Sequence, residues 1–409
     1  MCGVDTSKVL YKSIFMSNDF PPVLNEAKKN IFSIVPPFYL LNELAQKSSA
    51  NGEKWVVFWG TQFDNLPQIN EKEFCKQTNL CLDYIRRNFS DYRLVYKPHP
   101  AEPVIYPLLN LTGFDVLNER TAAEFFVFKN MAKIKYVFSA CSMASMTSWH
   151  LGLNSHSFWP LFKYTTIAET KDGYDDAFKK MPPEFFVSDL SQPVQENKKV
   201  LIRDQALWDN FSEILDKKRG VAWFILGDPG LLALTISMAS LIRQISPGRK
   251  IGLIIEKHHR WVVMDMNEVK KHFDAIQIFP RLFYSLRPGK IWKQLLTART
   301  IKNSKISSED ILIGGGAISL VENCFMSYFP KNYKIALLSD EAFRVCFGLK
   351  DPSFFRTHFS RRAFTFSNLI LEPLLGLHRT IYREDIGRVA NFGRYQEPVN
   401  DIYDQMLVF

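Results

Sequence analysis

The sequence is poor in cysteine and lacks the spacings that hold metals. Six cysteines occur among 409 residues, and none forms a Cys-x-x-Cys pair or lies in a histidine-rich cluster. Structural zinc sites use such spacings, so we expect neither a metal nor another cofactor. Cysteines scattered in this way are typical of a reducing cytoplasm.

The sequence also lacks a long uninterrupted apolar run. The N-terminus does not combine a basic start with an apolar stretch, so no secretory signal is expected. The most apolar stretch, residues 221–242, is interrupted by Gly-Asp-Pro-Gly at 227–230, which leaves each half too short to cross a bilayer. We therefore expect a buried strand, a turn and a buried helix there, and a cytoplasmic protein.

Positive charge, in contrast, is abundant. The formal net charge is +9. Such an excess favours an anionic partner, which could be a nucleotide, an acidic polymer or the inner surface of a membrane, although it also serves solubility. Nucleic acid is not among the partners we expect.

Apolar strands alternate with helical patterns twice along the chain, which predicts an α/β fold with two Rossmann-like domains. Residues 1–52 are irregular and read as an N-terminal extension or linker. A first Rossmann-like domain is expected over residues 53–219. A second is expected over residues 220–409, and the pattern leaves open whether it is complete.

A short apolar strand, residues 92–97, ends in the sequence Lys97-Pro98-His99-Pro100. Proline cannot donate to a strand ladder, so the strand stops at Pro98. Lys97 and His99 then lie at the carboxyl end of the strand, where open α/β sheets bind ligands. A plain strand end with an incidental histidine is equally compatible with this spacing.

A second polar run follows the next buried strand, at residues 139–146. Ser142 is placed to cap the helix that follows, and Ser139 ends the strand. The free N–H groups and the dipole of a helix N-terminus favour an anion such as phosphate. Capping without any ligand is the alternative.

The second half contains a dense basic stretch and a pair of carboxylates. The basic stretch includes Arg287, Lys290 and Lys293, which could hold an acidic acceptor, lie on anionic lipid or form a solvated helix face. Asp340 and Glu341 end a predicted strand, where they could act as a general base or cap the next helix. The glycine-containing turn at 227–230 is not GxGxxG, so no dinucleotide is inferred.

Together these motifs resemble the bacterial polysialyltransferases and sialyltransferases of the GT-B glycosyltransferase fold. The resemblance covers residues 54 to about 160 and rests on the strand with its lysine and His-Pro motif and on Cys141-Ser142 with Ser139 nearby. It implies that His99, Ser139 and Ser142 contact the phosphate and cytidine of a CMP-sugar. Lys97 and Pro100 belong to the same implied donor site.

The chain departs from this family in the order of its halves. The family places the domain with the general base before the His-Pro domain, whereas here the His-Pro domain comes first. The acidic motif of the family contains a glycine that Ser339-Asp340-Glu341-Ala342 lacks. The chain is then either circularly permuted or a fusion of two partial transferases.

The function implied is a metal-independent transfer of a sugar from a CMP-activated donor to a bacterial surface glycan. His99 would be the acid and Asp340 or Glu341 the base. Arg287, Lys290 and Lys293 would contact an anionic acceptor of capsule polysaccharide or lipooligosaccharide type, with peripheral association with the inner membrane as one option. The alternative is a non-catalytic nucleotide- or polysaccharide-binding protein made of fused partial transferase domains.

Overall fold

The structure is a computed structural model that describes most of the two predicted α/β regions. The residues described are 9–10, 25–27, 30–41, 43, 52–61, 70–99, 106–117, 121, 123–162, 178–179, 181–197, 203–227, 231–257, 266–280, 288–315, 320–338, 371–377, 380–383, 388–391 and 403–408. The chain divides into two compact units. Unit 1 comprises residues 1–36, 204–228 and 238–409, and unit 2 comprises residues 37–203 and 229–237.

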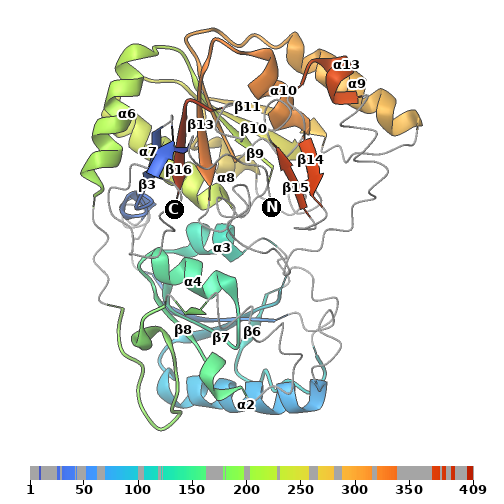
Figure 1. Cartoon of the computed structure of the whole chain (residues 1–409). Coiled ribbons are helices and arrows are strands. Elements are labelled where there is room, and N and C mark those ends of the chain that lie inside the picture. Colours follow the sequence, from blue (N-terminus) through green and yellow to red (C-terminus); the bar gives the residue numbers. More distant parts are fainter. Residues whose placement is uncertain are drawn as a thin grey trace. The chain divides into compact units, whose positions relative to one another are not determined.

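Unit 2 contains a five-stranded parallel sheet with the order β6-β5-β4-β7-β8. Its strands are β4 (Trp55–Trp59), β5 (Arg93–Lys97), β6 (Asp115–Val116), β7 (Ile134–Ser139) and β8 (Asn154–Ser157). Its helices are α2 (Glu71–Asn88), α3 (Ala123–Asn130), α4 (Met143–His150) and the 3-10 turns η3 (Trp159–Leu161) and η4 (Pro183–Phe185). Figure 1 shows α2 on one face of this sheet and α3 and α4 on the other.

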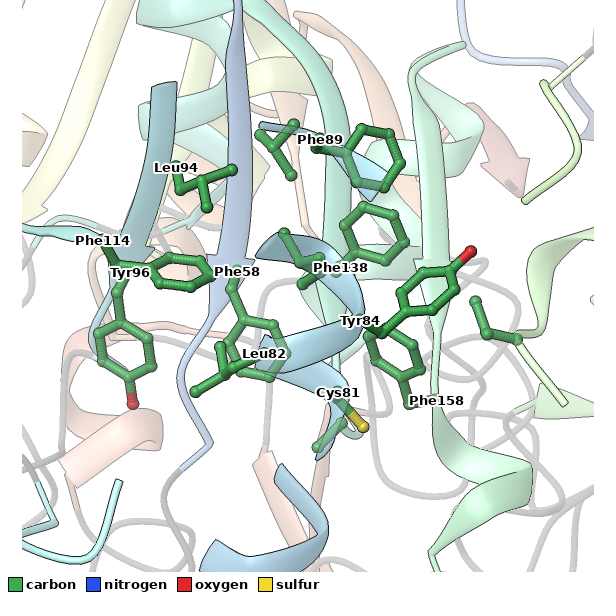
Figure 2. Close-up of a cluster of buried hydrophobic side chains, with 14 of the residues drawn as sticks. Phe58, Cys81, Leu82, Tyr84, Phe89, Leu94, Tyr96, Phe114, Phe138 and Phe158 are labelled. Carbon is green, nitrogen blue, oxygen red and sulfur yellow. The ribbon is translucent and has the colours of Figure 1, made fainter. Parts of the chain in front are cut away.

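The core of unit 2 forms because β4 and β5 are buried on both faces, as parallel strands require. Helix α2 begins at the cap Asn70, whose side chain accepts from the backbone N–H of Lys72 and Glu73. Its apolar face packs against the sheet. The rings of Tyr84 and Phe158 are 5.8 Å apart, and Figure 2 shows them in the aromatic cluster between α2 and the sheet.

Unit 1 contains a seven-stranded parallel sheet with the order β11-β10-β9-β12-β13-β16-β3. The first six strands of this order, read in chain order, follow the 3-2-1-4-5-6 pattern of a Rossmann fold. The strands are β3 (Asn30–Ser33), β9 (Ala222–Leu226), β10 (Ile251–Lys257), β11 (Ala275–Pro280), β12 (Ile311–Gly314), β13 (Tyr333–Leu338) and β16 (Gln405–Val408).

Helices connect these strands, and short antiparallel pairs lie outside the two parallel sheets. The helices are α6 (Gln205–Lys217), α7 (Leu232–Ile245), α8 (Met266–Lys270), α9 (Pro288–Lys302), α10 (Leu320–Tyr328) and α13 (Glu372–Leu375). The pairs are β1 (Val9–Leu10) with β2 (Asn25–Ala27) and β14 (Thr380–Arg383) with β15 (Arg388–Asn391). None of the helices that the structure describes is both long and apolar enough to cross a bilayer.

The structure contains two parallel Rossmann-like sheets, and the strand that precedes the His-Pro motif lies in the sheet of unit 2, which comes first in the chain. This confirms the fold class predicted from the sequence. The predicted strand that contains Lys97 is β5, and the helix predicted to start at Ser142 is α4. The sequence analysis did not predict β3, β8 or β16. Of these, β16 supplies the sixth strand of the Rossmann order in unit 1.

Close packing between β9 and β10 depends on a glycine. Gly252 of β10 pairs with Trp223 of β9, and a Cβ atom at Gly252 would overlap the indole ring of Trp223. The indole is fixed because its Nε1 donates to the carboxylate of Asp310 at 3.2 Å. The ring therefore cannot move aside without breaking a buried hydrogen bond.

We predict that Gly252→Ala destabilises the protein by about 1–3 kcal/mol, because the added methyl group overpacks the β9–β10 interface. Urea unfolding followed by tryptophan fluorescence measures the change. Gly289→Ala on α9 is the matched control, since nothing lies within 4 Å of a Cβ atom there. The control should unfold at an unchanged or slightly higher urea concentration. Equal unfolding midpoints for both variants would contradict this account of β10.

Candidate functional site

The candidate site lies at the carboxyl edge of the unit 2 sheet, where the strand order reverses between β4 and β7. Open α/β sheets bind ligands at such a point. The backbone N–H of Gly60 donates to the carbonyl of Lys97 at 2.8 Å, and Thr61 Oγ1 donates to the carbonyl of Cys141 at 3.4 Å. These two hydrogen bonds hold the ends of β5, β4 and β7 side by side.

Helix α4 starts at this edge, and its N-terminus is suited to an anion. Ser142 is the N-cap, and its hydroxyl accepts the backbone N–H of Ala144 at 3.2 Å. The α4 sequence contains no Asp or Glu. The positive end of the helix dipole is therefore not neutralised by a carboxylate of its own helix, which leaves it available to a phosphate.

Ser139 has a different position from Ser142. Ser139 is fully buried, and Ser145 Oγ donates to its hydroxyl at 2.6 Å. Two more buried serines continue this network, because Ser155 Oγ donates to the carbonyl of Ser145 and Ser157 Oγ donates to the carbonyl of Ala140. The network fastens the first turn of α4 to the ends of β7 and β8, so Ser139 positions the helix that Ser142 opens.

Lys97 is also buried, with 1% of its surface exposed. Its ammonium group donates to the carbonyls of Thr121 at 2.9 Å and Pro98 at 3.2 Å. Burying a charge requires such partners, and here they tie the turn after β5 to the segment that precedes α3. His99 lies in that turn and is half-buried. Lys97 therefore fixes the backbone that presents His99.

The structure places the other predicted site residues as follows. Lys290 and Lys293 are exposed on α9 of unit 1. Pro100, Arg287, Asp340 and Glu341 lie outside the described residues. Within the described part of the chain, no three His, Cys, Asp or Glu side chains are grouped so that they could hold a metal ion.

The sequence analysis missed Thr61, Ser145, Ser155 and Ser157. The only signal of the three serines in the sequence is the high frequency of small hydroxyl residues over 139–148 and 154–157, and Thr61 has no such signal. The segment Asn-Ser-His-Ser at 154–157 has too little apolar character to predict a buried strand.

The equivalent edge of unit 1 is occupied by the protein's own carboxylates. Glu256, at the end of β10, is 1% exposed and accepts the backbone N–H of Val321 in the first turn of α10 at 3.2 Å. Glu322 is buried in the same turn and accepts the hydroxyl of Tyr403 at 2.7 Å. A phosphate at the N-terminus of α10 would have to compete with the carboxyl of Glu256 for the backbone N–H of Val321, which disfavours binding there. Sequence reasoning did not single out either glutamate.

Comparisons with known proteins give no family. No protein-family model matches the chain, and no curated protein matches it. Five solved chains match it in structure. One is the wall teichoic acid polymerase TagF, in a structure with CDPG, at 12% identity over 73% of this chain and 74% of that one, with a TM-score of 0.19.

Two further matches are a heptosyltransferase and a glycosyl transferase. The E. coli heptosyltransferase WaaC with ADP is 11% identical over 69% of this chain and 86% of its own, with a TM-score of 0.16. A glycosyl transferase family 9 protein from Veillonella parvula is 10% identical over 71% and 83%, with a TM-score of 0.17. Similarity at this level does not establish the class of the protein, so the fold class rests on the sheet topology alone.

His156 of β8 lies between the two serines that support α4. Its Nδ1 is 3.0 Å from the carbonyl oxygen of Glu184, and its ring stacks on Phe138 with centroids 5.5 Å apart. Burial lowers the pKa of His156 from 6.5 to about 4, an effect that the hydrogen bond to Glu184 only partly offsets. The imidazole is therefore neutral in the folded protein at neutral pH.

We predict that His156 makes the folded state less stable in mild acid. Between pH 6.5 and about 4 the unfolded chain binds a proton at this residue and the folded chain does not. Its contribution to stability is thus complete above pH 6.5 and is lost as the pH falls toward 4, by about 3 kcal/mol. The measurement is the free energy of unfolding in urea across this range, for the native sequence and for His156→Phe, which keeps a ring on Phe138. Parallel pH dependences for the two proteins would show that His156 does not titrate in this way.

Proposed function

We propose that the chain is a GT-B-type glycosyltransferase that binds a CMP-activated sugar at the carboxyl edge of the unit 2 sheet. The observation that carries this proposal is the N-terminus of α4. It lies at the reversal of strand order, is opened by Ser142 and has no carboxylate in its own sequence. The corresponding edge of unit 1 already holds Glu256 against α10.

The spacing of the strands suits a phosphate. Neighbouring strands lie about 4.8 Å apart, so the ends of β5 and β7 are about 10 Å apart across β4. A phosphate above the end of β4 would then have the turn with His99 on one side and the first turn of α4 on the other. The hydrogen bonds from Gly60 and Thr61 keep these two sides in place.

The chemistry needs charge stabilisation on the leaving group. The bond between the anomeric carbon and a phosphate oxygen breaks, its electron pair stays on the phosphate, and CMP leaves. The α4 N–H groups and the Ser142 hydroxyl would stabilise that charge, and His99 would donate a proton to the phosphate. These groups perform the role that a metal has in other transferases, so the proposed reaction is metal-independent.

The acceptor half of the reaction needs a base. The acceptor hydroxyl forms the new bond to the anomeric carbon and loses its proton, and Asp340 or Glu341 is the proposed base. We propose an anionic bacterial surface polysaccharide or glycolipid as the acceptor, with sialyltransferase or polysialyltransferase chemistry. The exposed cations Lys290 and Lys293 on α9 are proposed for the acceptor side, and the enzyme would act beside the inner membrane.

We predict that His99→Ala slows the release of CMP from CMP-sialic acid by about 10²- to 10⁴-fold, the usual contribution of a general acid. The assay is CMP formation with an oligosialic acid acceptor. His150→Ala is the matched control, because His150 is exposed at the other end of α4. An unchanged rate in His99→Ala would rule out the proposed acid.

The same assay tests the alternative class. A non-catalytic binding protein would bind CMP in calorimetry and release none from any CMP-sugar with any acceptor. Competition by UDP or GDP, but not by CMP, would instead assign a different nucleotide to the same edge.

We predict that Ser142→Asp weakens the binding of CMP by at least about tenfold, whereas Ser142→Asn changes it little. Both side chains are good N-caps, so α4 is kept in both variants. Only Asp adds a negative charge beside the proposed phosphate position. Isothermal titration calorimetry gives the two affinities. Equal affinities in the two variants would place the phosphate elsewhere.

A further inference from the structure

Helix α9 has one face in the core of unit 1 and an opposite face that no described side chain covers. Gln294, Thr297, Ala298 and Ile301 are buried, and α10 lies beside α9 in Figure 1. On the other side, Trp292 is 62% exposed and Leu296 is 46% exposed. These two residues are four apart and so lie one above the other along the helix. They form a narrow apolar stripe that faces solvent.

Cations border this stripe, and the surrounding sequence has no acidic residue. Lys293 and Arg299 are exposed on α9 beside the stripe, together with Lys290 near its start, whereas the ammonium of Lys302 lies over the ring of Tyr328 on α10, 5.8 Å from its centroid. No Asp or Glu occurs from residue 275 to residue 308. Arg299 is seven residues after Trp292 and shares its side of the helix, while Lys293 flanks it on the other side. Long basic side chains on either side of an apolar stripe can reach outward while the stripe enters an apolar layer.

We propose that α9 docks the protein on an anionic phospholipid surface, with Trp292 and Leu296 in the interfacial layer and the flanking cations on the headgroups. A solvated helix face does not need an exposed Trp–Leu stripe. An acidic polysaccharide would satisfy the cations but offers little apolar surface to the stripe. A bilayer interface satisfies both, because tryptophan and leucine gain from its apolar layer and basic residues from its negative surface potential.

This inference deepens the proposed function and rests on it only for the location of the acceptor. A glycosyltransferase docked through α9 would meet lipid-linked or nascent surface glycans at the membrane, so Lys290 and Lys293 would contact the anionic acceptor at the same surface as the headgroups. The docking itself involves neither α4 nor His99, so its test is separate from the test of the chemistry.

The experiment is flotation of the full chain with vesicles of phosphatidylcholine alone and of phosphatidylcholine with one-third phosphatidylglycerol. We expect binding to the anionic vesicles, little binding to the neutral ones, and weaker binding as the salt concentration rises. The double variant Trp292→Ser with Leu296→Ser should bind the anionic vesicles about tenfold or more weakly. Leu80→Ser is the matched control, because Leu80 is 52% exposed on α2 and lies outside the stripe. It should bind as the native sequence does.

Three outcomes would overturn the proposal. The native chain could fail to bind anionic vesicles, the double variant could bind them as well as the native chain does, or the chain could bind polysialic acid but no vesicle. CMP release with a water-soluble acceptor is measured in parallel. The double variant should keep this activity, and His99→Ala should lose it while still floating with the vesicles, so failure of either proposal is recognised separately.

Discussion

Each unit is built around a parallel strand that is buried on both faces and at which the order of the strands reverses. In unit 2 this strand is β4, and in unit 1 it is β9. Parallel strands without helices on both faces would expose apolar side chains, so α2 must cover one side of the unit 2 sheet and α3 with α4 the other. The connections then diverge at the carboxyl end of the central strand. That divergence creates a place in each sheet where a helix N-terminus and loop residues can meet a ligand without competing with the core.

The two units share this topology but differ in the side chains that they place there. Unit 2 presents a serine cap on α4, fixed from below by the buried pair Ser139 and Ser145. Unit 1 presents α10 with Glu256 already bound to its first turn. A fold does not determine a function, and here two similar folds in one chain present different groups at the same edge of the sheet. The nucleotide proposed at unit 2 therefore depends on the groups at the start of α4, and the strand order gives only their location.

Much of this could be read from the sequence, and the failures have identifiable causes. Continuous apolar runs predict β4, β9, β10 and β12 because strands buried on both faces need them. The capping preference of serine predicts the start of α4. The strand β8 was missed because its serines and its histidine are buried only through hydrogen bonds made in the folded state. The strands β3 and β16 are short and pair only across long separations in sequence.

The sequence predicted that the side chains of the candidate site lie at the carboxyl edge of the sheet, but it did not predict which contacts each of them makes. A lysine at a strand end is normally an exposed cation, and the burial of Lys97 depends on the carbonyl of Thr121, which comes from a distant loop. The sequence of α9 likewise shows cations beside Trp292, but only packing decides which face of the helix is covered.

The central claim is that α4 binds the donor phosphate, and the most direct measurement is a crystal structure with CMP. We expect a phosphate oxygen within hydrogen-bond distance of a backbone N–H in the first turn of α4, and CMP bound instead at the carboxyl edge of unit 1 would contradict the account.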